Sequence, residues 1–163
     1  MGTRDMRKRT TWLLAILAGA VAVGFVVETL QRDGAGAVAV ADIEAGKALY
    51  AQNCASCHGA GLEGQPDWQS PGADGILPAP PHDETGHTWH HDDALLFTYT
   101  RLGGEETLKA IGVSGVKSGM PAFGDLLSDA EIADILAFIR STWPERMQKI
   151  QRQRSEAQKL KGN

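Results

Sequence analysis

The sequence has very little cysteine: its 163 residues include only Cys54 and Cys57, which lie in one short segment. A disulfide-stabilised domain needs several cysteines spread along the chain, so that class of protein is excluded. The sequence also lacks a strand pattern, because no segment shows a sustained alternation of apolar and polar residues. The absence of strand patterns, together with the helix signals described below, predicts an all-α fold.

Positive charge is scarce in the middle of the chain. Residues 42–144 hold five cations against fifteen acids, a net charge of −10, whereas residues 1–41 have a net charge of +2 and residues 145–163 of +4. Because the acidic middle would repel phosphates, we expect no nucleic-acid partner. An acidic field instead steers the chain toward partner proteins with a basic docking surface.

Only one long hydrophobic run occurs, the uncharged residues 10–27. As a helix this run would be about 27 Å long, close to the thickness of a bilayer core. We expect residues 1–9 to be a basic cytoplasmic segment, residues 10–27 a transmembrane signal anchor and residues 28–41 a flexible linker. The alternative is a signal peptide cleaved after residues 39–41. Both readings place the rest of the chain on the periplasmic side of a bacterial inner membrane, and the first makes the protein single-pass.

Capping signals predict three helices in residues 42–144. Asp42 begins a helix that runs to about residue 55, and Asp92 begins another that ends at Gly103. Ser128 and Glu131 form a capping box before a strongly amphipathic helix. The buried faces are expected to consist of Leu95, Leu96, Tyr99 and Leu102 in the second helix, and of Ile132, Ile135, Leu136 and Ile139 in the third. Residues 59–91 are interpreted as loop. For the basic C-terminal tail, residues 145–163, a solvated or frayed chain is favoured over a further helix.

Residues 54–58 have the sequence Cys-Ala-Ser-Cys-His, the C-x-x-C-H attachment motif of c-type haem. The thiols of Cys54 and Cys57 add to the two porphyrin vinyl groups, and His58 follows at once as the proximal iron ligand. A zinc site would need a second pair of ligands, and a redox dithiol would need a βαβ setting. We therefore expect one covalent haem c.

Met120 is the best candidate for the second axial ligand of the iron. Of the four methionines, two precede the anchor and Met147 lies in the basic tail, whereas Met120 sits in a loop before the last amphipathic helix. Ligation by His58 and Met120 would raise the reduction potential and close both faces of the iron. This pair favours electron transfer over oxygen or peroxide chemistry.

With these motifs in place, the sequence resembles the class I c-type cytochromes, here a membrane-anchored member with one haem. The resemblance covers about residues 42–144 and implies that the first and last helices cross at Gly46, with Tyr50, Ile135 and Phe138 nearby. It also implies a proline carbonyl that accepts the N–H of the proximal histidine, for which Pro66 and Pro71 are candidates. The matching residues are Gly46, Leu49, Tyr50, Cys54, Cys57, His58 and Gly59, the segment 119–123, and the helix from Ser128 to Trp143.

The other four histidines of the chain cluster within ten residues, together with a tryptophan: His82, His87, Trp89, His90 and His91. Two hypotheses remain open for this cluster. In the first, its rings and N–H groups contact the haem propionates and cap the next helix. In the second, its imidazoles hold a second metal ion such as copper or zinc. The spacing of the histidines matches no standard zinc pattern, which favours the first hypothesis.

The sequence therefore predicts an electron carrier, not an enzyme, with no small-molecule substrate. It would shuttle electrons between membrane respiratory or photosynthetic complexes. One alternative is a dedicated haem subunit that accepts electrons from a periplasmic dehydrogenase. The other is a haem sensor or enzyme with an open iron, which would require Met120 not to ligate.

Overall fold

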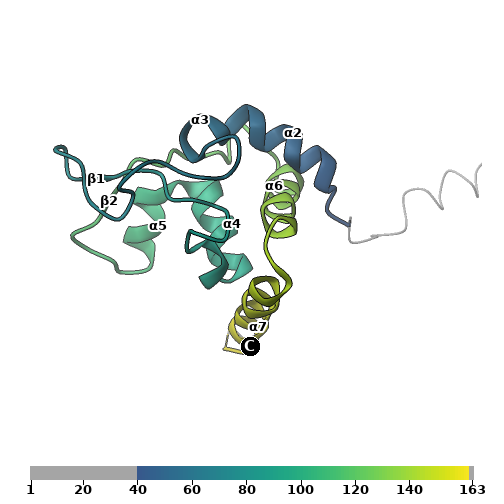
Figure 1. The fold of residues 1–163 in the computed structure, drawn as a ribbon. Coiled ribbons are helices and arrows are strands. Elements are labelled where there is room, and N and C mark those ends of the chain that lie inside the picture. The colour runs from purple at the N-terminus through teal and green to yellow at the C-terminus, as the bar shows by residue number, and fades with distance from the viewer. Residues whose placement is uncertain (1–39, 162–163) are drawn as a thin grey trace, which may run out of the picture. The chain divides into compact units, whose positions relative to one another are not determined.

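The computed structural model describes residues 40–161, which form helices joined by long loops and one very short sheet (Figure 1). The predicted anchor at residues 10–27, the basic segment before it, most of the linker and the cleavage alternative lie outside the described residues. Among residues 40–161, no helix is both long and apolar enough to cross a membrane. The helices are α2 (Ile43–Asn53), α3 (Ala55–His58), α4 (Asp93–Leu102), α5 (Gly104–Ala110), α6 (Asp129–Ser141) and α7 (Glu145–Lys161), with a 3₁₀ turn η1 (Thr88–His90).

The expected caps begin three of these helices. The Asp42 carboxylate accepts hydrogen bonds from the backbone N–H groups of Glu44 and Ala45, and Asp92 accepts one from Leu95. Ser128 and Glu131 form the reciprocal capping box at the start of α6. Each cap satisfies donors that a helix N-terminus otherwise leaves unpaired, which explains why these short helices start where they do.

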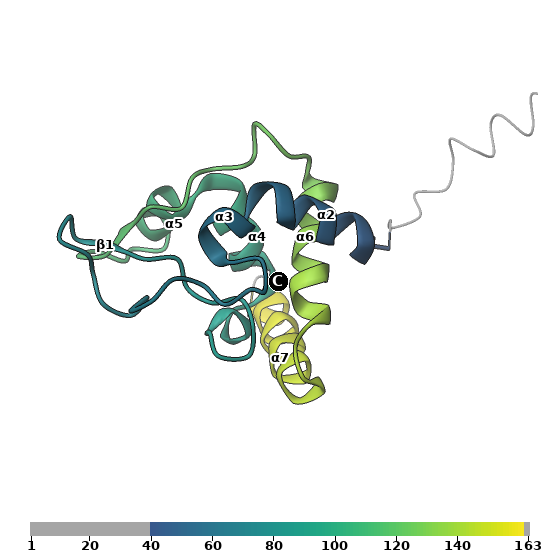
Figure 2. The same cartoon turned by 45° about the horizontal axis from the view of Figure 1, so that its top comes forward.

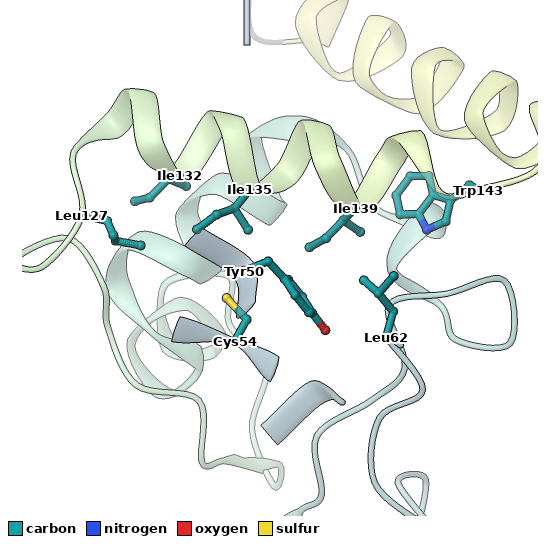
Figure 3. Packing of buried hydrophobic residues seen from close by; sticks show 8 residues of the cluster. All are labelled: Tyr50, Cys54, Leu62, Leu127, Ile132, Ile135, Ile139 and Trp143. Atoms are coloured by element: carbon teal, nitrogen blue, oxygen red, sulfur yellow. The ribbon is translucent and has the colours of Figure 1, made fainter. Parts of the chain in front are cut away.

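Helices α2 and α6 cross at a point where their backbones touch. A Cβ atom on Gly46 would lie only 2.0 Å from the carbonyl oxygen of Asp134, so this position admits no side chain. The core lies along the crossing, where Tyr50 of α2 and Cys54, which caps that helix, face an isoleucine row of α6 (Figure 3). The buried apolar residues are Tyr50, Cys54, Leu62, Leu127, Ile132, Ile135, Ile139 and Trp143. The crossing and the isoleucine face agree with the expectations from the sequence, except that Leu136 packs against the core only partly buried.

The prediction from the sequence omitted two short strands, the 3₁₀ turn η1 within the expected loop, and helix α5. Residues Ile76–Leu77 (β1) and Lys117–Ser118 (β2) form a parallel two-stranded ladder, and α5 follows directly on the glycine that ends α4. Strands of two residues carry no alternation to detect, and Gly103 serves both as the C-cap of α4 and as the N-cap of α5. The expected buried face of α4 is also only half-buried, and Leu102 is 46% exposed.

The basic C-terminal segment differs most from expectation, because residues 145–161 form helix α7 instead of a solvated tail. The helix lies beyond the end of α6 and contacts η1 and α4 (Figure 2). Its buried residues are polar: the Gln151 amide donates to the Asp93 carboxylate at 2.8 Å, and the Ser155 hydroxyl accepts from the Asp93 N–H at 2.9 Å. A search for apolar periodicity misses such an interface, because polar side chains make it.

We predict that Gly46→Ala destabilises the domain strongly. The new methyl group would overlap the backbone of α6, and overpacking of this kind costs about 3 kcal/mol of the free energy of unfolding. Guanidinium unfolding followed by circular dichroism measures this cost. The exposed neighbour provides the control, since Lys47→Ala should leave the midpoint nearly unchanged.

We predict that Gln151→Ala destabilises the docking of α7. The substitution removes the hydrogen bond from a fully buried amide to the partly exposed Asp93 carboxylate, at a cost of about 1 kcal/mol. Gln153 on the same helix is exposed, so Gln153→Ala is the matched control. Equal unfolding midpoints for the two variants would contradict a structural role for the polar interface.

Candidate cofactor site

The C-x-x-C-H motif lies at the junction of α2 and α3. Cys54 caps the C-terminal end of α2 and is buried, whereas Cys57 on α3 is exposed, and neither thiol forms a disulfide. Burial, and after it the charge of Cys57, raises the pKa of the Cys54 thiol to about 11. The chain therefore offers two thiols, one directed into the core and one at the surface, three residues apart.

His58 ends α3, and its ring is held by a backbone carbonyl. Nδ1 lies 2.8 Å from the carbonyl oxygen of Pro80. Since a carbonyl only accepts hydrogen bonds, the proton must be on Nδ1, and Nε2 keeps its lone pair. Burial lowers the pKa of His58, although the bond to Pro80 opposes this shift. Burial, the larger effect, favours the neutral imidazole, and the bond to Pro80 places its proton on Nδ1. The result is a ring with one free nitrogen, the form in which histidine ligates a metal.

The carbonyl that orients His58 belongs to Pro80, so the expectation of Pro66 or Pro71 was wrong. The reason lies in the loop from residue 65 to residue 79, whose two ends are joined by hydrogen bonds. The Gln65 N–H donates to the carbonyl of Ala79, and the Gln65 side-chain oxygen accepts from the Ala79 N–H, both at 2.9 Å. Residues 66–78 therefore form a loop that leads away from His58, and the chain comes back beside His58 only at Pro80. No local pattern in the sequence indicates this return.

Met120 lies in a loop held from both sides, at the expected place before α6. Its N–H donates to the Ser118 hydroxyl at 3.3 Å, and its carbonyl accepts from the Gly104 N–H at 3.0 Å. A Cβ atom on Gly104 would lie 1.9 Å from the Ser118 hydroxyl oxygen, so the α4–α5 junction fits closely against this loop. Sequence reasoning identified Met120 but missed Gly104 and Ser118, whose role depends on contacts between distant segments.

The histidine cluster divides into two parts. His82 stacks on His58 with ring centroids 4.0 Å apart, and its Nδ1 lies 2.9 Å from the Thr88 hydroxyl. Burial, and after it the charges of His58 and His87, lowers the pKa of His82 well below its usual value. The Trp143 indole donates to the His82 carbonyl at 2.7 Å, which ties this segment to the end of α6.

The remaining rings of the cluster lie farther from His58 in the sequence and contact one another. His87 stacks on Trp68 and meets His91 edge to face, and Trp89 packs against His90. The Trp89 indole donates to the Gly86 carbonyl at 3.1 Å. Within residues 40–161, no three His, Cys, Asp or Glu side chains are placed to hold a metal ion. Contact between this cluster and the propionates stays a prediction.

The donor set is the one a covalent haem requires. It comprises two thiols and one neutral imidazole with a free Nε2. Ligation by the Met120 thioether, on a separate loop, stays a prediction. Helix α4 adds half-buried apolar side chains, among them Leu95, Leu96 and Tyr99, the kind of surface that packs against a porphyrin. The residues therefore fit haem c, whereas they fit neither a disulfide nor a zinc centre.

Comparison with known protein families gives one match. The family model described as cytochrome c oxidase, cbb3-type, subunit III matches residues 41–139. The match includes the C-x-x-C-H motif, Met120 and most of α6, and it ends before α7. Neither the comparison with curated proteins nor the comparison with solved structures found a match.

We predict that both thiols bind the cofactor covalently. The double variant Cys54→Ala, Cys57→Ala should lose all haem stain on a denaturing gel, because no thioether remains. Ser56→Ala, which changes an exposed residue between the two cysteines, should keep the stain. Stain that persists in the double variant would contradict the attachment.

Proposed function

Since this chain belongs to the cbb3-type cytochrome c family and carries covalent haem c, we propose that it transfers electrons with His58 and Met120 as the axial iron ligands. The family supports electron transfer in general. The assignment of His58 rests on one observation above all, its hydrogen bond to Pro80, which leaves Nε2 free for iron. The assignment of Met120 is supported by its loop before α6, which is held by Ser118 and Gly104. When bound, the haem supplies a one-electron couple between ferrous and ferric iron.

Other residues of the chain hold the proposed ligands and their loops in place. Cys54 and Cys57 anchor the ring, and the Pro80 carbonyl fixes the tautomer and direction of His58. The loop that follows Met120 is pinned to the end of α4, because Phe123 and Gly124 donate to the carbonyls of Thr100 and Arg101 at 3.1 and 2.9 Å. Two ligands held on rigid backbone change little between oxidation states, which suits outer-sphere transfer.

We place this activity on the periplasmic face of a bacterial inner membrane, with residues 10–27 as the anchor. The support is the charge pattern around the hydrophobic run and the export that haem attachment at a C-x-x-C-H motif implies. The partners are redox proteins, and the net charge of −10 over residues 42–144 favours those with a basic docking surface. The carrier would exchange electrons with respiratory or photosynthetic membrane complexes.

A second candidate is a dedicated haem subunit of an oxidoreductase complex. The description of the matching family, which names an oxidase subunit, favours it. Mild detergent extraction followed by purification on the haem absorbance separates the two candidates. A partner retained in fixed ratio supports the subunit, and a haem protein that elutes alone supports the carrier.

We predict that the oxidised protein shows the sulfur-to-iron charge-transfer band and that Met120→Ala abolishes it. The reduced variant should then bind carbon monoxide, because one face of the iron becomes accessible. The matched control is Met147→Ala, which removes a methionine that packs against the core and should keep the band. A wild type that lacks the band and binds carbon monoxide readily would instead support a sensor or enzyme with an open iron.

A further inference from the structure

The short ladder between β1 and β2 joins the two loops that serve the proposed iron ligands (Figure 1). Ile76 is paired with Lys117, and Leu77 with Ser118. The Ile76 side chain also lies over the Met120 loop, because a Cβ atom on Gly119 would be 3.1 Å from Ile76 Cγ2. Contact between these segments, about forty residues apart, is therefore made by both backbone and side chain.

On the His58 side, β1 lies close in sequence to the residue that orients the proposed proximal ligand. Only two residues separate Leu77 from Pro80, whose carbonyl holds His58 Nδ1. Ala79, directly before Pro80, is fixed by both the backbone and the side chain of Gln65. Strand β1 thus belongs to the same braced segment as the proximal hydrogen bond.

On the other side, β2 ends two residues before Met120. The Ser118 hydroxyl accepts from the Met120 N–H, so the ladder residue itself touches the ligand's backbone. The chain before β2 gives little support. Its three apolar side chains are exposed, and a Cβ atom on Gly112 or Gly115 would meet nothing within 4 Å; these side chains belong to Ile111, Val113 and Val116. On the N-terminal side of Met120, the restraint therefore comes from the ladder and from the start of α5, where Gly104 donates to the Met120 carbonyl and the Glu105 carboxylate accepts from the Ser118 N–H at 3.5 Å.

We propose that this ladder is a clamp that positions Met120 for ligation by fixing its loop to the segment that orients His58. The inference rests on the ligand pair proposed above. Ile76 is a positioning residue in it, since Ile76 acts on Met120 through Gly119 and the β2 backbone. Without the clamp the loop has more conformations to lose on ligation, so the sulfur competes less well with other ligands.

The test is Ile76→Gly in the full-length protein, with the pH at which half of the charge-transfer band is lost as the measured quantity. Hydroxide and amines displace a weakly held sulfur as the pH rises. We expect the half-loss about one pH unit below that of the wild type, which corresponds to about tenfold weaker ligation. Carbon monoxide should bind the reduced variant about tenfold faster, in proportion to the population with an open iron.

Val113→Gly is the matched control, because it removes a similarly exposed β-branched side chain from the loop that lies outside the ladder. It should keep the wild-type half-loss pH. If Ile76→Gly also keeps it, the clamp is refuted while the ligand pair stands. If the wild type has no band at all, the ligand pair and the clamp both fail.

A double variant distinguishes positioning of Met120 from a general loosening of the fold. In a Met120→Ala background, Ile76→Gly should not change the rate of carbon monoxide binding further, since no sulfur remains to be positioned. A further acceleration in that background would show that Ile76 controls access to the iron instead, and would overturn the proposal.

Discussion

The backbone contact between Gly46 and Asp134 is the constraint on which the rest of the structure depends. It lets α2 and α6 approach closely enough for Tyr50 to be buried against Phe138, with ring centroids 5.5 Å apart. The Tyr50 hydroxyl then donates to the carbonyl of Gly59 at 3.0 Å, and this bond fixes the chain directly after His58. A helix crossing without any chemistry of its own thereby helps to set the position of His58, the proposed proximal ligand.

The same crossing organises the two loops that carry Pro80 and Met120. At its C-terminal end, α6 leads into Trp143, whose indole holds the His82 carbonyl and with it the segment that follows Pro80. At its N-terminal end, the chain enters α6 from the Met120 loop, which is tied to α4. One helix therefore connects to the loops of both proposed ligands, and the ladder of β1 and β2 joins these loops a second time.

The features predicted correctly from the sequence are those with a local physical cause. Side-chain caps such as Asp42 and the Ser128 capping box act within four residues, and the isoleucine row of α6 repeats with the helical period. Pro80, Gly104 and the ladder depend on contacts between segments far apart in the chain. Helix α7 was not predicted for another reason. It docks through Gln151 and Ser155, whereas the search for amphipathic helices counts only apolar residues.

Helix α7 also changes how the charge of the domain acts on a partner. The six cations of residues 145–161 are all exposed, and they lie on a helix that packs against η1 and α4 of the acidic domain. A flexible basic tail would average its charge over many positions, whereas a docked helix fixes it on one side. The positive charge of α7 and the negative charge of residues 42–144 give the folded unit a dipole. In the field of a charged partner, a dipole orients the domain in addition to attracting it.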